Sequence, residues 1–142
     1  MKPLAGGLAA LAVAAYCLAC SSPREPAPEY VVRRRNPVAS SEDVLTRARS
    51  DFRAHCVECH GLEGKGDGPT SGMLGKQPAD LTNPAVLGSL TDGEIFWTVS
   101  RGDRPIMPAF EGKLTEEERW GLVHLMRTLS NTLHDSSPRA RR

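Results

Sequence analysis

The sequence predicts a small helical domain whose helices are joined by loops rich in glycine and proline. Three segments combine a capping residue with apolar residues at helical spacing, at 41–55, 91–100 and 115–130. Glycines and prolines interrupt the chain between them, and no strand pattern surrounds the cysteine pair that follows the first segment. Residues 41–135 are therefore expected to form one domain, of about 95 residues.

The first two helices have clear start and stop signals. Ser40 or Ser41 can cap the first helix, which has acidic residues in its first turn and runs into Cys56. Thr91 is predicted to cap a short helix that ends at Gly102. Residues 70–90, between these helices, are expected to be irregular apart from one short turn near Pro84–Leu87.

The last helix is predicted to open at a capping box formed by Thr115 and Glu118. It has a broad apolar face, made of Leu122, Val123, Leu125, Met126 and Leu129. His124 lies on the same helix and is expected to be an ordinary surface histidine.

A cysteine pair at the end of the first helix indicates the chemistry of the chain. Cys56 and Cys59 are three positions apart, and His60 follows directly. On one helical turn both sulfurs can reach a haem vinyl group, and His60 can offer a nitrogen to the iron as the proximal ligand. The pattern therefore predicts one covalently attached haem c, which would also supply core that so small a domain lacks.

Two other sites can contain a cysteine pair with this spacing. Half of a zinc site would need a second pair at zinc-ligand spacing, and none follows. A thioredoxin-type redox pair would need flanking strands, and the sequence shows none around Cys56 and Cys59. Neither alternative explains why His60 is adjacent.

The stretch from Gly61 to Pro69 is too rich in glycine to be a stable helix or strand. We expect a loop whose backbone passes close to the haem, and not a phosphate-binding loop, because no strand precedes it. The carbonyl of Pro69 could accept the outer ring N–H of His60 and fix the imidazole. Leu74 and Leu81 are expected to cover haem edges. Trp97 either donates to a haem propionate or is a half-buried packing residue.

Met107 is the candidate for the second iron ligand. Pro105 and Pro108 flank Ile106 and Met107, prevent a helix and hold the backbone extended. A thioether presented from a stiff loop can bind iron opposite His60, although most methionines simply fill gaps in a core. Met73 and Met126 are poorer candidates, the first by its closeness to His60 in sequence and the second because it faces a helix interface.

The beginning of the chain predicts export from the cytoplasm. An uncharged apolar stretch from Pro3 to Cys20 follows Lys2, as in a secretory signal. About eighteen uncharged residues is also the lower limit for spanning a bilayer, so a retained anchor is an alternative. The residues around Cys20 resemble a bacterial lipoprotein cleavage site, with Cys17 where that family usually has leucine. A lipid on Cys20 would tether the protein to a membrane surface.

The segments on either side of the domain are basic. Residues 21–40 hold four prolines and few apolar residues, which predicts an extended, semi-rigid linker and not a packed unit. The arginines at 33–35 are expected to be solvated or to contact anionic lipid or an acidic partner. Residues 136–142 are expected to form a disordered basic tail. Residues 41–135 carry a net charge of −5, which favours a redox partner with a basic docking surface and does not suggest nucleic-acid binding.

Four of these pieces, in this order, resemble the class I c-type cytochromes, especially small bacterial single-haem domains. They are Cys56–Gly61, Gly66–Pro69, Met107–Phe110 and Glu118–Val123, within a resemblance that covers about residues 44–130. The resemblance implies an all-α class I cytochrome c fold, a few short helices around one haem, in which the first and last helices cross. At the crossing the family usually has a glycine and an aromatic residue, where this sequence has Ala48 and Leu125. We expect the crossing to survive, because the two changes together conserve volume.

The resemblance and the residues together predict one-electron transfer by a His/Met-ligated haem c in a bacterial respiratory chain, on the periplasmic side of a membrane. Two axial ligands leave no open iron position for a substrate, so we expect an electron-transfer protein and not an enzyme. The alternative is a haem subunit of a larger membrane oxidoreductase complex, such as a quinol-oxidising complex. A sensor that binds a gas would require a vacant or labile iron site.

Overall fold

The computed structural model describes residues 26–135, and their regular secondary structure is helical. Within these residues no strand forms, and a single bridge joins Asp103 to Met107. The elements in chain order are α2 (Glu29–Val32), α3 (Glu42–His55), α4 (Val57–His60), the 3₁₀ turn η1 (Ser71–Met73), α5 (Pro84–Leu87), α6 (Asp92–Arg101) and α7 (Glu116–Asp135). The predicted all-α fold is confirmed.

Helices α3, α6 and α7 begin at the expected residues, and α7 continues beyond the expected end to Asp135. Ser41 caps α3 by accepting from the amide of Val44 at 3.2 Å. A capping box between Thr91 and Glu94 opens α6, and Gly102, at φ +78°, ends it. The predicted box of Thr115 and Glu118 is also present, because the Thr115 amide donates to the Glu118 carboxylate and the Glu118 amide to the Thr115 hydroxyl. These local signals fix where each helix lies along the chain.

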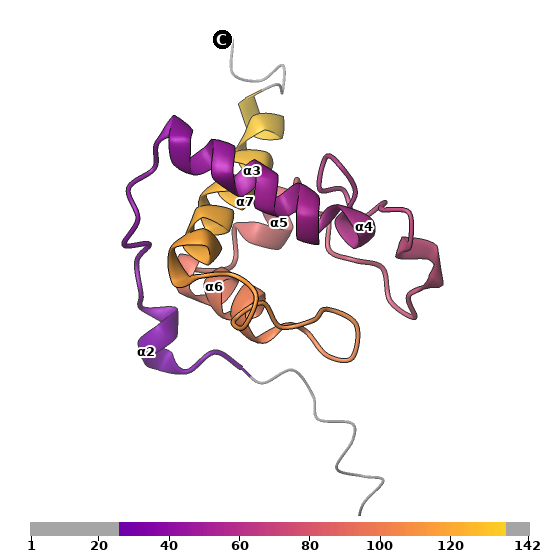
Figure 1. Ribbon diagram of the computed structural model, residues 1–142, viewed down its shortest axis with the longest axis horizontal. Helices are drawn as coiled ribbons and strands as arrows, with labels where there is room; N and C mark the ends of the chain where they lie inside the picture. Colours follow the sequence, from indigo (N-terminus) through magenta and orange to yellow (C-terminus); the bar gives the residue numbers. More distant parts are fainter. Residues whose placement is uncertain (1–25, 136–142) are drawn as a thin grey trace, which may run out of the picture.

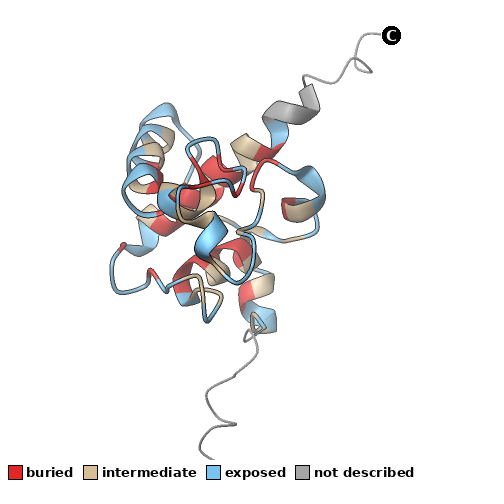
Figure 2. Ribbon diagram, turned by 90° about the vertical axis from the view of Figure 1, so that its right-hand side faces the viewer, coloured by how far each residue is buried: buried red, intermediate tan, exposed pale blue. Residues whose placement is uncertain are grey.

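Helix α3 lies across α7, with α6 on the other side of α7 (Figure 1). The centre of the core is on α7, where Trp120, Leu122 and Val123 are fully buried. In Figure 2 the buried positions gather between the helices, and the exposed ones lie outside. The predicted apolar faces of the helices therefore meet in one core.

Gly121 lies at the crossing of α3 and α7. A Cβ built on Gly121 would lie 3.6 Å from the Cβ of Ala48 and 3.6 Å from the side chain of Val44. Leu125 is buried one turn further along α7. These are ordinary van der Waals distances, so the crossing would accommodate a methyl group at position 121. The predicted crossing is preserved.

The linker prediction is wrong for residues 28–38, which pack on the domain and are called the N-terminal strap below. Val31 is only 4% exposed, and the Arg34 side chain lies over the Trp120 ring. Asn36 donates to the Trp120 carbonyl at 2.9 Å, and a ring nitrogen of His124 lies 2.7 Å from the Val38 carbonyl. Figure 1 shows the strap beside α7, and its helix α2 contacts α6. Composition predicted an extended backbone, whereas Glu29–Val32 form α2 and the strap contacts distant residues.

His124 and Arg34 therefore differ from their predictions. His124 is part-buried and holds the strap, so it is not an ordinary surface histidine. Arg34 forms an ion pair with Glu116 at 2.6 Å, so it is not simply solvated. The predictions for the leader and Cys20, and for the basic tail at 136–142, lie outside the described residues. Within 26–135 no helix has both the length and the apolar character needed to cross a membrane.

Candidate haem site

The turn that joins α3 to α4 brings the three motif residues together. The Cys56 amide bonds back to the Phe52 carbonyl at 2.9 Å and so closes α3. The Cys56 carbonyl then accepts from the amides of Cys59, at 3.2 Å, and His60, at 2.8 Å. Both cysteines are free thiols. One turn of backbone thus presents two sulfurs and an imidazole from neighbouring positions.

These residues open into an apolar cavity of about 290 Å³. Its volume is close to the lower end of the range for small-molecule sites, roughly 300–1,000 Å³. Helices and loops from the whole length of the domain contribute to its lining, which includes Cys56, Cys59, His60, Leu74, Pro78, Leu81, Leu87, Leu90, Ile95, Val99, Ile106, Met107, Phe110, Leu122 and Met126. The cavity is the structural counterpart of the predicted haem pocket.

Met107 lines the same cavity as His60, from the loop between α6 and α7. Its amide and carbonyl both bond to Asp103, at 2.9 and 3.1 Å, and so close a turn over residues 104–106. A side chain at Gly102 would collide with the Met107 carbonyl, so the glycine allows this backbone approach. The backbone bridge, together with the two prolines, fixes where Met107 is presented.

Ala79, and not Pro69, contacts the outer ring nitrogen of His60. The distance from His60 Nδ1 to the Ala79 carbonyl oxygen is 3.1 Å. The prediction for Pro69 is wrong because the neighbouring Gly68 turns the chain against α4, where its amide bonds to the Cys59 carbonyl at 3.1 Å. Pro69 itself is exposed. The segment that passes beside the imidazole comes ten residues later.

Burial shifts the pKa values of two of these groups. It lowers the pKa of His60, an effect that the hydrogen bond to Ala79 partly opposes. The imidazole therefore favours the neutral form, which is the form that binds a metal. Burial, with smaller contributions from Asp51 and Cys59, raises the pKa of Cys56 to about 12. In this fold the thiol stays protonated at neutral pH and is a weak nucleophile.

Comparison with known proteins identifies the family. Residues 43–126, more than half of the chain, match the family described as cytochrome c oxidase, cbb3-type, subunit III. The chain belongs to this family and is a small class I c-type cytochrome. No curated protein sequence matches the chain.

The solved structures that resemble this cytochrome include a protein complex and a c-type cytochrome. One is the Kuenenia stuttgartiensis reducing HAO-like protein complex Kustc0457/Kustc0458, with a TM-score of 0.58 and 27% identity over 75% of this chain and 51% of that one. The chain thus spans about half the length of this first neighbour. The other is the KustC0563 c-type cytochrome, with a TM-score of 0.52 and 26% identity over 58% of this chain and 95% of that one.

Family membership implies covalently bound haem c and haem-mediated electron transfer, and the residues of the site fit both. The two thiols lie one turn apart, as thioether attachment requires. The neutral imidazole of His60 suits an iron ligand, and the apolar lining suits a porphyrin. Within residues 26–135 no three His, Cys, Asp or Glu side chains cluster as a direct metal site.

Most of the other predicted residues of this cytochrome lie at or near the cavity. Leu74 and Leu81 line it, and so does Met126, which was expected only at a helix interface. Met73 is 78% exposed and is not among the lining residues. Trp97 is partly exposed, with the Arg101 guanidinium 5.3 Å from its ring centre.

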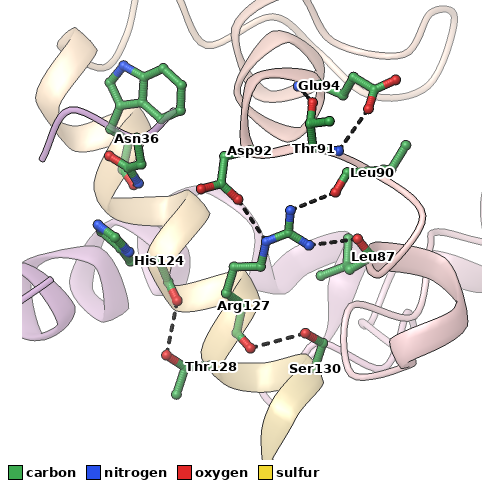
Figure 3. A network of polar contacts seen from close by, with 11 residues as sticks. Asn36, Leu87, Leu90, Thr91, Asp92, Glu94, His124, Arg127, Thr128 and Ser130 are labelled. Atoms are coloured by element: carbon green, nitrogen blue, oxygen red, sulfur yellow. Dashed lines mark hydrogen bonds and ion pairs between the residues drawn. The ribbon is translucent and has the colours of Figure 1, made fainter. Parts of the chain in front are cut away.

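Arg127 holds part of the cavity wall, a role that was not predicted from the sequence. Its guanidinium donates to the carbonyls of Leu87, at 2.7 Å, and Leu90, at 2.6 Å, and to the Asp92 carboxylate at 2.8 Å (Figure 3). Leu87 and Leu90 both line the cavity. The sequence did contain a signal for this role, since Arg127 follows Val123 by four positions and so falls on the buried face of the helix. A charged residue there requires partners.

Proposed function

We propose that this cytochrome is an electron carrier with one haem, whose iron is ligated by His60 and Met107. The strongest support is that one apolar cavity is lined by both cysteines, His60 and Met107. A haem attached through Cys56 and Cys59 would supply an iron that cycles between the ferrous and ferric states.

The residues around the cavity have separate tasks in this proposal. The Ala79 carbonyl orients His60 and leaves its other ring nitrogen for the metal. Met107 offers a soft, neutral thioether, which favours ferrous iron and raises the reduction potential relative to a second histidine. The apolar lining excludes water and disfavours the additional charge of the ferric state. With His60 and Met107 both bound to it, such an iron would have no position left for a substrate.

The variant Met107→Ala tests the ligation in the haem-loaded protein. We expect the haem to stay attached, the reduction potential to fall, and carbon monoxide to bind the ferrous form. Redox titration and the visible spectrum under carbon monoxide measure the two effects. Met73→Ala is the matched control, because Met73 is 78% exposed, and it should change neither property.

Met126 is the rival ligand, because its side chain also lines the cavity. Met126→Leu keeps the volume but removes the sulfur, and it should leave the potential and the carbon monoxide response unchanged. An unchanged potential with no carbon monoxide adduct in Met107→Ala, together with both effects in Met126→Leu, would transfer the role to Met126. The mass of the purified protein should exceed that of the chain by one haem.

For its location we propose the periplasmic side of a bacterial membrane, with the protein held there by a lipid on Cys20 or by a retained leader. The support is the uncharged stretch from Pro3 to Cys20 and the small residues before Cys20. Within a respiratory chain the acidic domain favours a redox partner with a basic docking surface. Mass spectrometry of protein purified from membranes distinguishes a lipidated Cys20 from an intact leader, and a mature chain with neither would contradict the tether.

A second candidate function is a permanent haem subunit of a larger oxidoreductase complex. The observation in its favour is that one structural neighbour is itself a protein complex, in which the matched chain is about twice as long as the part that aligns. A permanent subunit should co-purify with its complex from detergent-solubilised membranes. A carrier should separate from it.

A further inference from the structure

Two loops meet beside His60 and are joined by a backbone hydrogen bond. We call residues 61–66 the glycine loop and residues 77–81 the facing segment. The Gly66 amide donates to the His60 carbonyl at 2.8 Å, and the Leu81 amide donates to the Gly64 carbonyl at 2.7 Å. The glycine loop is thus attached to α4 at one end and to the facing segment near its middle.

The two loops approach as closely as glycine permits. Gly66 has φ +77°, and a Cβ built on it would collide with the Pro78 carbonyl and lie 3.4 Å from the Ala79 carbonyl oxygen. Because the atoms that such a Cβ would meet belong to the backbone, they could not rotate away. Glycine at position 66 therefore allows the segment that carries Ala79 to pass this close to the glycine loop.

One side chain ties the facing segment to this contact. Gln77 Nε2 donates to the Gly66 carbonyl at 2.5 Å, two residues before Ala79. Without that bond, the facing segment would be held to the glycine loop chiefly at Leu81, on the far side of Ala79. Gln77 also borders the cavity, but none of the proposed steps of haem attachment or iron ligation uses its amide.

We propose that Gln77 is a positioning residue for the axial histidine. It holds the facing segment against the glycine loop and so keeps the Ala79 carbonyl on His60 Nδ1. A carbonyl held at Nδ1 makes the imidazole a stronger donor to iron, which stabilises the ferric state and lowers the reduction potential. This inference rests on the proposed ligation of iron by His60.

The variant Gln77→Met tests the proposal in the haem-loaded protein, because methionine is similar in length, uncharged and unable to donate. We expect the reduction potential to become more positive. We also expect the Nδ1 proton of His60 to exchange with solvent several-fold faster, as measured by NMR. The amount of attached haem should not change. Ser71→Ala, a neutral change outside both loops, is the control and should leave both values as in the wild type.

The two readouts separate positioning from general packing. A change in packing alone would alter the potential without selectively speeding exchange at His60 Nδ1. If Gln77→Met leaves both the potential and the exchange rate unchanged while the His60 ring resonances show iron ligation, this proposal fails and the proposed function stands. If those resonances show that His60 does not ligate the iron in the wild type, both fail.

Discussion

The guanidinium carbon of Arg34 lies 5.2 Å from the centre of the Trp120 ring, so an arginine from the N-terminal strap covers the most deeply buried aromatic residue of α7. The Phe96 ring stacks on Trp120 at 4.1 Å, and the same guanidinium is 5.3 Å from its centre. Arg34 thereby closes the outer side of the contact between α6 and α7.

We expect Arg34→Ala to destabilise the haem-loaded protein by about 1–2 kcal/mol, because it removes a cation–π contact and an ion pair with Glu116. Denaturant unfolding followed by circular dichroism measures the loss. Arg33→Ala is the control, since Arg33 pairs with Glu29 and both side chains are largely exposed. It should cost less than about 0.5 kcal/mol. Equal effects from both variants would mean that the strap is not held by Arg34.

The same ion pair predicts a pH dependence. Hydrogen bonds from Arg34 and from the indole of Trp120 lower the pKa of Glu116. A carboxylate whose pKa is lower in the folded state stabilises the fold above its unfolded pKa, about 4.3, and loses that contribution as the pH falls through the folded value. The stability difference between the wild type and Glu116→Gln should therefore be present at pH 7 and be lost progressively as the pH falls below about 4.3. A difference that is constant from pH 7 to pH 3 would contradict the assignment.

Gly93 is predicted to be required for docking of the strap. A Cβ at Gly93 would collide with the carbonyl oxygen of Val31, a backbone atom that cannot rotate away. Gly93→Ala should therefore release the strap and speed tryptic cleavage at the arginines of residues 33–35, even though alanine favours the helix by roughly 1 kcal/mol. Gly112→Ala has open space around it and should be cleaved like the wild type. Equal cleavage of the two variants would show that the strap does not depend on Gly93.

Arg127 is predicted to be irreplaceable by lysine. Its planar guanidinium serves two carbonyls and one carboxylate in different directions, and a single ammonium group cannot match that geometry. Arg127→Lys should lose about 2–4 kcal/mol of stability in denaturant unfolding. Arg49→Lys, at an exposed ion pair with Glu42, should lose less than about 0.5 kcal/mol. Near-wild-type stability of Arg127→Lys would show that the charge alone suffices.

The parts of the fold that could be predicted from sequence are those decided by neighbours along the chain. The helix caps at Ser41, Thr91 and Thr115 depend on groups three residues away, so the nearby sequence was enough to predict them. The haem-attachment motif is equally local, because Cys56, Cys59 and His60 occupy one turn. The apolar faces of α6 and α7 also followed from their periodicity.

What the sequence could not supply are contacts between distant segments. The partner of His60 Nδ1 depends on which loop passes beside the ring, and the backbone approach at Gly66 decides in favour of Ala79. The strap was missed because Arg34 and His124 find partners more than 80 residues away in the sequence. Arg127 likewise joins α7 to residues 35 to 40 positions earlier.

Two opposite faces of helix α7 contact different parts of the protein. Glu116, Trp120 and His124, each four residues apart, form the side that receives the strap. Leu122 and Met126 line the cavity, and at 100° per residue they fall on the opposite side of the helix from Trp120 and His124. The strap therefore packs on the face of α7 that points away from the cavity. A label attached to Tyr30, an exposed residue of the strap, would leave the cavity side uncovered.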